Sequence, residues 1–352
     1  MVAAIHPALQ HRDAPRTPRP LPLFLDMVRD AAVRDPELAR RALEGMRLYG
    51  LAARPVREPL PVAYAEGRAR LLQCGTAGPP VVLVPSLINP SVVLDLDEKR
   101  SLVRFIATRG YRALLLDWGS PTSDEADLDI AGHVERYLLP LITQVGEPVH
   151  LVGYCLGGTM AIAAAALVQP RSLTLLATPW HYSRYPRDAS DRLSAMWRET
   201  RPSVEAMGLM PMEMLQPAFW SLDRERSVAK YAALTGLAED APAVVTFAQL
   251  EDWANDGAPL TRAVADDLFE RFIAEDRPGS GRWAVGGCSI DPAAIGCPTL
   301  HFVASNDRIA PSETAPDAIR TTACPSGHVG MIVGSRAAES CWTPLTNWLD
   351  MH

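Results

Sequence analysis

The sequence predicts an α/β protein with a mostly parallel sheet. From residue 80 to residue 177, short runs of β-branched residues and leucine alternate with amphipathic or alanine-rich segments. The same alternation returns from residue 299 towards the C-terminus. Strands that alternate with helices are joined by right-handed crossovers and lie parallel in one sheet. The segment between these two stretches is therefore expected to be an insertion.

The composition fits one large α/β domain with an insertion, or two ordinary domains. Of the 352 residues, 48% are hydrophobic, and 34 basic residues stand against 41 acidic ones. The arginines are scattered, so we predict no nucleic-acid partner. No apolar run reaches the roughly 18 residues of a transmembrane segment. The six cysteines lack the spacing of a zinc site, so we predict no metal and a reduced, cytoplasmic protein.

The N-terminal part is expected to be helical after a tail. Residues 1–22 are rich in proline and arginine and lack the apolar core of a secretory signal, so we predict a disordered tail. Residues 23–70 are predicted to be an N-terminal helical segment, with Pro36 as a break or a new helix start. A helix pair leading into the main domain is the simpler interpretation, and an amphipathic surface for a partner or a polymer granule is the alternative.

The core is predicted to cover residues 71–180 and 292–352. The segments predicted to be strands are residues 81–84, 113–116, 149–152, 173–177 and 299–303. The segments predicted to be helices are residues 101–108, 130–144, 158–168 and 336–349. Residues 181–291 are rich in aromatic residues and methionine without clear strand alternation, which predicts a largely helical cap insertion.

The hexapeptide Gly-Tyr-Cys-Leu-Gly-Gly at residues 153–158 stands between a predicted strand and a predicted helix. This is the arrangement of a nucleophile elbow, whose tight turn requires small residues such as Gly153, Gly157 and Gly158. At the start of a helix, the peptide dipoles lower the pKa of a thiol. The sequence therefore predicts an α/β-hydrolase fold with Cys155 as the nucleophile, and a buried structural cysteine is the alternative.

A cysteine that attacks an acyl group needs a base, an acid to orient the base, and donors for the oxyanion. In this fold the acid and the base follow the nucleophile in the chain. His328 lies in a glycine-flanked loop before the last predicted helix, and Asp307 directly follows the strand at 299–303. We predict these two as base and acid. Asp117 competes as the acid, and His181 is a less favoured neighbour of the site.

The oxyanion hole is expected to consist of two backbone N–H groups. The fold supplies one from the residue after the nucleophile, which is Leu156. The second comes from the loop after the strand at 81–84, where Leu87 is the candidate.

With these residues placed, the chain resembles the polyhydroxyalkanoate synthases from about residue 79 to residue 348, and is most like the short synthases that work with a second subunit. The motifs that carry the resemblance are Val-Pro-Ser-Leu-Ile-Asn at 84–89, Val-Leu-Asp-Leu at 93–96, Leu-Asp-Trp-Gly-Ser-Pro at 116–121, the Cys155 hexapeptide, Ala-Thr-Pro at 177–179, Glu-Asp-Trp at 251–253, Asn-Asp-Arg-Ile-Ala-Pro at 306–311 and Gly-His-Val-Gly at 327–330.

The resemblance implies an acyltransferase that polymerises 3-hydroxyacyl groups taken from coenzyme A thioesters. Cys155 would carry the acyl group, His328 would deprotonate the thiol and then the next 3-hydroxyl, and Asp307 would support that step. No cofactor is implied beyond the coenzyme A thioester substrate. The implied partners are a second synthase subunit, a homodimer through the cap and the surface of a polymer granule.

The chain departs from the synthase pattern beside the site. Synthases usually have a second proline where Ser86 stands, a basic residue where Pro90 stands, an aromatic at Ser91 or Val92, and a histidine where Arg308 stands. A cysteine hydrolase of the same fold, such as a thioesterase, esterase or intracellular depolymerase, remains an alternative. A weakly active scaffold on polymer granules is a further one.

Overall fold

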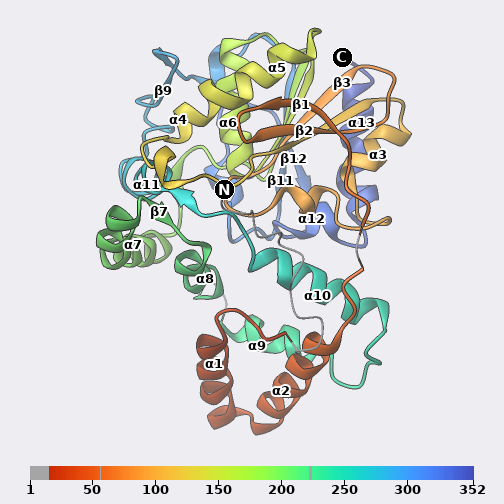
Figure 1. Cartoon of the computed structure of the whole chain (residues 1–352), viewed down its shortest axis with the longest axis vertical. Coiled ribbons are helices and arrows are strands. Elements are labelled where there is room, and N and C mark those ends of the chain that lie inside the picture. Colours follow the sequence, from red (N-terminus) through yellow and green to blue (C-terminus); the bar gives the residue numbers. More distant parts are fainter. Residues whose placement is uncertain (1–15, 56, 222–223) are drawn as a thin grey trace, which may run out of the picture. The chain divides into compact units, whose positions relative to one another are not determined.

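The largest element of the molecule is an eight-stranded sheet (Figure 1). The computed structural model describes residues 16–55, 57–221 and 224–352. The strands follow the order β1-β2-β4-β3-β5-β6-β11-β12. Their bounds are β1 Val62–Glu66, β2 Ala69–Cys74, β3 Pro80–Val84, β4 Arg112–Asp117, β5 His150–Tyr154, β6 Ser172–Leu176, β11 Thr299–Ala304 and β12 Thr321–Cys324.

The sheet is parallel from β4 to β12, and β1 and β2 form an antiparallel hairpin at one edge. All five predicted strands are present, as β3, β4, β5, β6 and β11. The strands β3, β5 and β6 are buried along their whole length. Fully buried parallel strands consist of continuous apolar runs, and for this reason they could be predicted from the sequence. The predicted α/β-hydrolase class is confirmed.

Helices cover both faces of this sheet (Figure 1). The helical stretch of α4 Ile130–His133, a π-helical turn at Val134–Leu138 and α5 Leu139–Val145 lies on the same face as α6 Leu156–Leu167. The opposite face is covered by α3 Leu102–Thr108 and α13 Thr343–Leu349. The residues of α6 from Leu156 to Ala165 are buried. Its small side chains let its axis approach the sheet closely, as the alanine-rich sequence predicts.

The structure corrects the boundary of the N-terminal helical segment predicted at 23–70. The helices there are α1 Leu21–Arg34 and α2 Pro36–Leu51, and Asp35 caps α2 by accepting from Leu38 N at 2.9 Å. The hairpin β1–β2 follows them and pairs with the sheet. Most of β1 is exposed, and the sequence analysis did not predict it as a strand. The predicted disordered tail, residues 1–22, lies mostly outside the described residues, and its last two residues begin α1.

By its internal contacts the chain divides into two units, and this division also corrects the predicted cap at 181–291. The first unit contains Met1–Val56 and Phe219–Asp252, and the second contains Arg57–Ala218 and Trp253–His352. The middle of the predicted cap therefore belongs with the N-terminal helices and not with the rest of the insertion. Two helices of the insertion, α8 Met212–Ser221 and α10 Pro242–Ala254, cross the boundary between the units.

The part of the insertion in the second unit is mostly helical, as predicted. It contains α7 Arg187–Met207, α11 Arg262–Asp266 and a π-helical segment at Asp267–Ala274. Two short antiparallel pairs that the sequence did not predict accompany them, β7 Leu209–Met210 with β8 Leu260–Thr261 and β9 Ala284–Val285 with β10 Cys288–Ser289.

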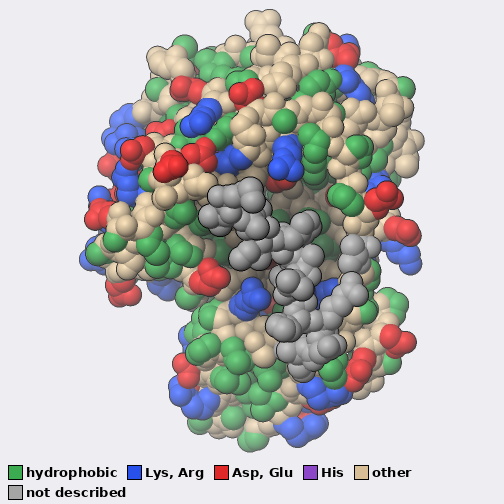
Figure 2. All heavy atoms as spheres, viewed as in Figure 1, with side chains coloured by type: hydrophobic (Ala, Val, Ile, Leu, Met, Phe, Trp, Pro, Cys, Tyr) green, Lys and Arg blue, Asp and Glu red, His purple; other side chains and the backbone are tan. Residues whose placement is uncertain are grey.

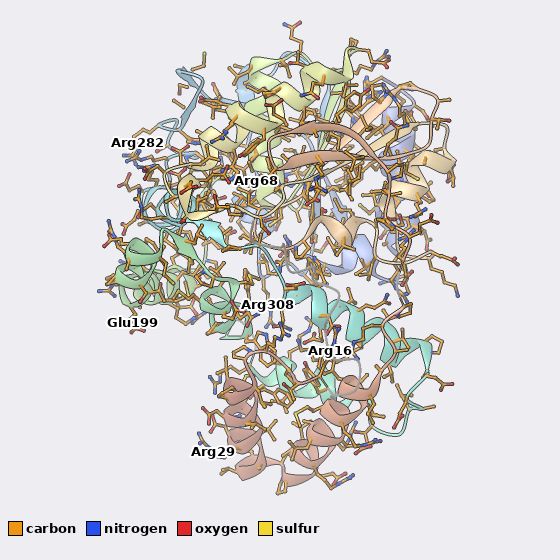
Figure 3. The ribbon with its side chains drawn as sticks, in the orientation of Figure 1. Arg16, Arg29, Arg68, Glu199, Arg282 and Arg308 are labelled. Carbon is orange, nitrogen blue, oxygen red and sulfur yellow. The ribbon has the colours of Figure 1, made fainter. Side chains whose placement is uncertain are left out.

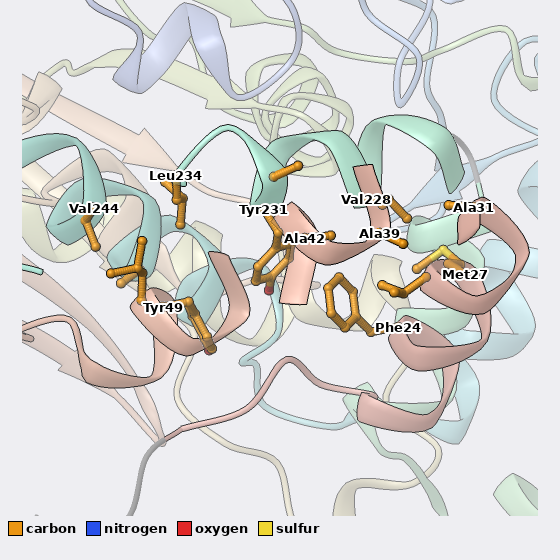
Figure 4. Close-up of a cluster of buried hydrophobic side chains, with 14 of the residues drawn as sticks. Phe24, Met27, Ala31, Ala39, Ala42, Tyr49, Val228, Tyr231, Leu234 and Val244 are labelled. Atoms are coloured by element: carbon orange, nitrogen blue, oxygen red, sulfur yellow. The ribbon is translucent and has the colours of Figure 1, made fainter. Parts of the chain in front are cut away.

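The first unit has a hydrophobic core of its own (Figure 4). Phe24 of α1 is fully buried, and its ring centroid lies 4.7 Å from that of Tyr231 in α9 Arg224–Ala232. The helices α2 and α9 pack very closely at Gly45, where an added Cβ would lie 1.8 Å from Tyr231 O. A side chain at residue 45 would push these helices apart.

Charged side chains of both signs are interspersed on the face seen in Figure 2. This agrees with the scattered arginines of the sequence. None of the helices in the described part of the chain combines the length and the apolar character that crossing a membrane requires.

Candidate active site

Cys155 lies at the sharp turn between β5 and α6, as the elbow motif predicts. Its backbone has φ 57° and ψ −131°, a region that residues with a side chain rarely adopt. Cys155 N donates to Leu176 O at 2.9 Å, and Gly158 N donates to Cys155 O at 2.9 Å. These two bonds hold the strained residue in place, so its half-buried thiol stands at the carboxyl edge of the sheet.

Each of the three predicted elbow glycines has a neighbour that excludes a side chain. A Cβ at Gly153 would lie 2.4 Å from Gly158 Cα, and a Cβ at Gly157 would lie 2.2 Å from Val84 O. At Gly158 it would lie 1.8 Å from the hydroxyl oxygen of Thr178. The glycines are therefore required by close packing of the turn against β3 and the end of β6.

The predicted acid and base lie together at the same edge. Asp307 follows β11, His328 follows β12, and His328 Nδ1 is 2.7 Å from Asp307 Oδ2. The other carboxylate oxygen of Asp307 accepts from Ile309 N and Ala310 N, both at 2.8 Å. Since both side chains are almost completely buried, the carboxylate has little freedom to turn away from the imidazole.

The loops that carry these two residues are tied to each other by their backbones. Ser305 N donates to Cys324 O at 2.9 Å, and Asn306 N donates to Ser326 O at 3.0 Å. These bonds join the two loops just beyond the ends of β11 and β12. They restrict the separation of Asp307 and His328.

The electrostatic environment favours the protonated form of His328. Burial alone would lower the pKa of this imidazole, but the charges of Cys155 and Asp307, together with hydrogen bonds to both, raise it to about 10. Cys155 therefore lies within reach of the imidazole. The structure brings the three predicted residues Cys155, His328 and Asp307 together.

The backbone N–H groups of the two predicted oxyanion donors have no partner in the part of the chain that the structure describes. No hydrogen bond donated by the backbone N–H of Leu87 or Leu156 is found among the described residues. In the same loop as Leu87, the Ile88 N–H is occupied, because it donates to Ser86 Oγ at 3.1 Å. Leu87 and Leu156 remain predictions as oxyanion donors.

Two tyrosines that the sequence reasoning missed lie beside the predicted acid and base. The ring of Tyr154, the residue before the nucleophile, lies 5.1 Å from that of His328, and its hydroxyl donates to His328 O at 3.4 Å. The hydroxyl of Tyr185 donates to Ile309 O at 2.8 Å, beside Asp307. Tyr154 stands inside the recognised hexapeptide, but its role depends on a loop 174 residues later, for which the sequence carries no signal.

Asp117, the competing candidate for the acid, and His181, the less favoured neighbour of the site, form contacts elsewhere. Asp117 accepts from Gly119 N at 3.1 Å in the turn after β4. His181 Nε2 lies 3.3 Å from Asp317 Oδ2. Neither contact involves Cys155 or His328. Among the described residues, no group of three or more His, Cys, Asp or Glu could hold a metal ion.

The residues that depart from the synthase pattern lie in the loops around this site. Ser86 forms the hydrogen bond to Ile88 N described above, and Pro90 O accepts from Trp253 Nε1 at 2.8 Å. Arg308 follows the acid and is exposed. Ser86 and Pro90 therefore shape the loop of the predicted oxyanion donor, while Arg308 faces solvent.

Comparison with known families and structures agrees with the fold. The model of the alpha/beta hydrolase family matches residues 81–339. Among solved structures, BpoC of Mycobacterium tuberculosis H37Rv, assigned as a non-heme bromoperoxidase, aligns with a TM-score of 0.52 and 16% identity. The alignment covers 82% of this chain and 98% of BpoC. This likeness concerns the fold alone.

Several curated relatives are poly(3-hydroxyalkanoate) polymerase subunits named PhaC. The protein of Haloferax mediterranei is 26% identical over 316 residues, which is 82% of this chain and 63% of that protein. The protein of Haloarcula marismortui is 26% identical over 76% of this chain and 60% of that protein. The chain thus spans about three fifths of these two relatives.

A third relative matches over most of both chains. The polymerase subunit of Allochromatium vinosum is 26% identical over 77% of this chain and 80% of its own length. The family match covers residues 81–339, and these three relatives match 76–82% of the chain. The chain belongs to the alpha/beta hydrolase family, and over most of its length it is similar to poly(3-hydroxyalkanoate) polymerase subunits.

Proposed function

We propose that this protein is an acyltransferase that takes 3-hydroxyacyl groups from coenzyme A thioesters onto Cys155 and joins them into polyhydroxyalkanoate. The observation that carries the proposal is the cysteine at the elbow beside a buried imidazole, which is paired with a fully hydrogen-bonded carboxylate. The relatives named as polymerases support it. A thiol suits this reaction because exchange between two thioesters is nearly balanced.

In the first half-reaction, the Cys155 thiolate attacks the thioester carbonyl carbon. His328 has a raised pKa, so the imidazole beside Cys155 can take up the thiol proton and hold it. The negative charge that develops on the carbonyl oxygen would be stabilised by the N–H groups of Leu87 and Leu156. When the bond to coenzyme A breaks, the imidazolium gives its proton to the departing thiolate, which leaves a neutral His328 and an acyl group on Cys155.

In the second half-reaction, neutral His328 takes the proton of a 3-hydroxyl group. The resulting oxygen attacks the acyl carbon on Cys155, an ester bond forms, and the Cys155 thiolate leaves beside the restored imidazolium. Asp307 stabilises the imidazolium in both half-reactions and keeps its Nδ1 turned inward. No group other than the coenzyme A thioester is required for this cycle.

The remaining parts of the proposal concern the surroundings of the enzyme. We propose that it acts in the cytoplasm at the surface of polymer granules, together with a second synthase subunit or as a homodimer. The relatives named as polymerase subunits support the part of this proposal that concerns a second subunit.

Turnover of 3-hydroxybutyryl-CoA by the full chain tests the proposal. We expect free coenzyme A to appear, together with ester-linked oligomers that mass spectrometry detects. Cys155→Ala should abolish the release, whereas Cys288→Ala, which removes an exposed thiol away from the site, should not. Release no greater than that of Cys155→Ala would contradict the proposal. Free 3-hydroxybutyrate as the only product would support the cysteine hydrolase instead.

A further inference from the structure

The loop of residues 85–90, which carries Leu87 and is here called the oxyanion loop, is held by side chains from outside the triad. This loop contains the departures Ser86 and Pro90, so its geometry cannot be carried over from the family pattern. A backbone donor stabilises an oxyanion only if it is held in position before the reaction, and a misplacement of about 1 Å costs on the order of 100-fold in rate.

The first end of the oxyanion loop is fixed by the turn after β4. Trp118 Nε1 donates to Pro85 O at 3.0 Å. Arg68, which Figure 3 labels and which lies in the turn between β1 and β2, donates to Trp118 O and, at 3.3 Å, to Gly119 O. Pro85 O is also in close contact with Gly157 of the elbow. The start of the loop is therefore rigidly attached to the nucleophile turn.

The second end is fixed by residues 253–257. Trp253 Nε1 donates to Pro90 O at 2.8 Å. Asn89 Nδ2 lies 3.4 Å from Trp253 O and 3.3 Å from Ala254 O. A Cβ at Gly257 would lie 2.7 Å from Ile88 O. Three consecutive residues of the loop thus touch this segment, and Trp253 makes the shortest of the hydrogen bonds.

Within the loop, one hydrogen bond selects which amide is available. The Ser86 side chain accepts from Ile88 N at 3.1 Å. This bond removes the Ile88 N–H as a donor and leaves that of Leu87 without a partner among the described residues. With both ends held, the direction of the Leu87 N–H depends on Pro85 at one end and on Asn89 and Pro90 at the other.

We infer that Trp253 is a positioning residue for the acyl-transfer step, which it serves by holding the oxyanion loop so that Leu87 N–H points at the developing oxyanion. The inference rests on the proposed function, because it concerns the same site. Trp253 itself does not touch the reacting atoms. Its side chain is almost completely buried, with 9% of its surface exposed, so its indole N–H has a fixed direction.

Trp253→Phe tests this role, because it removes the N–H and keeps an aromatic ring. We expect the maximal rate of Cys155 acylation by 3-hydroxybutyryl-CoA, and by a p-nitrophenyl ester, to fall by about 10- to 100-fold with little change in the half-saturating concentration. Alkylation of Cys155 by iodoacetamide forms no oxyanion. Its rate should therefore be unchanged, which a general structural defect would not allow.

Trp283→Phe is the matched control. Trp283 is similarly buried, at 5% exposed, but its indole nitrogen has no hydrogen-bond partner within the described part of the chain. This substitution leaves a similar void without removing a hydrogen bond, so both rates should stay close to those of the wild type. Equal loss of acylation in the two variants would overturn the inference, and so would parallel loss of acylation and alkylation in Trp253→Phe.

Gly257→Ala provides a second variant that does not depend on loss of a large side chain. Its methyl group would press on Ile88 O from the same segment, so acylation should fall while alkylation persists. Unchanged acylation in both Trp253→Phe and Gly257→Ala would also overturn the inference. The p-nitrophenyl ester separates this result from failure of the proposed function. A wild type that reacts with the ester but not with the coenzyme A thioester contradicts only the proposed substrate, whereas a wild type acylated by neither contradicts both proposals.

Discussion

At the scale of single residues, the site combines strain with charge. Cys155 has a positive φ, a conformation that costs roughly 1–3 kcal/mol and persists only where the surrounding structure enforces it. The three glycines of the elbow supply that enforcement by letting β3, β5 and α6 meet. The gain is a thiol held beside an imidazole whose protonated form is stabilised by two negative neighbours.

The first prediction concerns Asp307→Asn, which removes one of these negative neighbours. The pKa of His328 should fall below its wild-type value of about 10, because a neutral amide supplies no charge. Nuclear magnetic resonance titration of the imidazole measures this directly. Acyl transfer should fall by about 100-fold or more, since an asparagine can also favour the wrong tautomer.

The same substitution has a consequence for stability against pH. A folded-state pKa raised above the ordinary value of 6.5 stabilises the fold fully below pH 6.5, and this contribution disappears as the pH rises through about 10. The free energy of unfolding of the wild type should therefore decline between these pH values, and Asp307→Asn should flatten the decline. An identical pH profile in both proteins would contradict the assigned charge environment.

At the scale of elements, the sequence predicted the strands that form continuous apolar runs. The buried strands β3, β5 and β6 and the elbow were predictable from local patterns. The order of nucleophile, acid and base in the chain was enough to select Asp307 and His328. The hairpin β1–β2 was not predicted, and its first strand is largely exposed. The strand β12 was not predicted because its four residues, which are mostly exposed or half-buried, form no apolar run. Contacts such as Trp118 with Pro85 join segments far apart in sequence, so no local pattern reveals them.

The second prediction belongs to the helix pair α2 and α9. Gly45→Ala should be favourable by about 1 kcal/mol from helix propensity alone. The added Cβ, however, would lie 1.8 Å from Tyr231 O, which is backbone and cannot rotate away. Overpacking typically costs about 1–3 kcal/mol, so the clash outweighs the propensity and the first unit should be destabilised. Chemical denaturation monitored by circular dichroism measures the change.

Gly132→Ala in α4 is the control for this prediction. There the nearest atom to the added Cβ is Leu128 Cδ1 at 2.8 Å, the end of a flexible side chain that can move aside. This variant should be close to neutral or slightly stabilised. If the free energy of unfolding changed no more in Gly45→Ala than in Gly132→Ala, this result would contradict the close approach of α2 to α9.

At the scale of the whole molecule, two units each possess their own core. The cluster around Phe24 contains only residues of the first unit, while the sheet and the triad lie in the second. The sequence did not predict this division, because residues 219–252 are separated from α1 and α2 by the whole sheet-forming part of the chain up to β6. Only tertiary packing shows that α9 completes the N-terminal helix pair.

The third prediction tests that separation with Phe24→Ala. Phe24 is fully buried against Trp220 and Tyr231, and removal of such a ring costs about 3–5 kcal/mol. Since the loss falls on the core of the first unit, hydrogen exchange should accelerate in α1, α2 and α9 and stay slow in β3 and β5. The rate of Cys155 alkylation should not change.

The opposite result is expected for Phe302→Ala, which removes an equally buried ring from β11. Because β11 leads directly to Asp307, this substitution should accelerate exchange in the sheet and alter the reactivity of Cys155 through the His328 pair. The exchange of α1 and α2 should be unaffected. If each substitution accelerated exchange equally in both units, the two cores would unfold as one cooperative structure, and a role for the first unit in supporting the active site would have to follow.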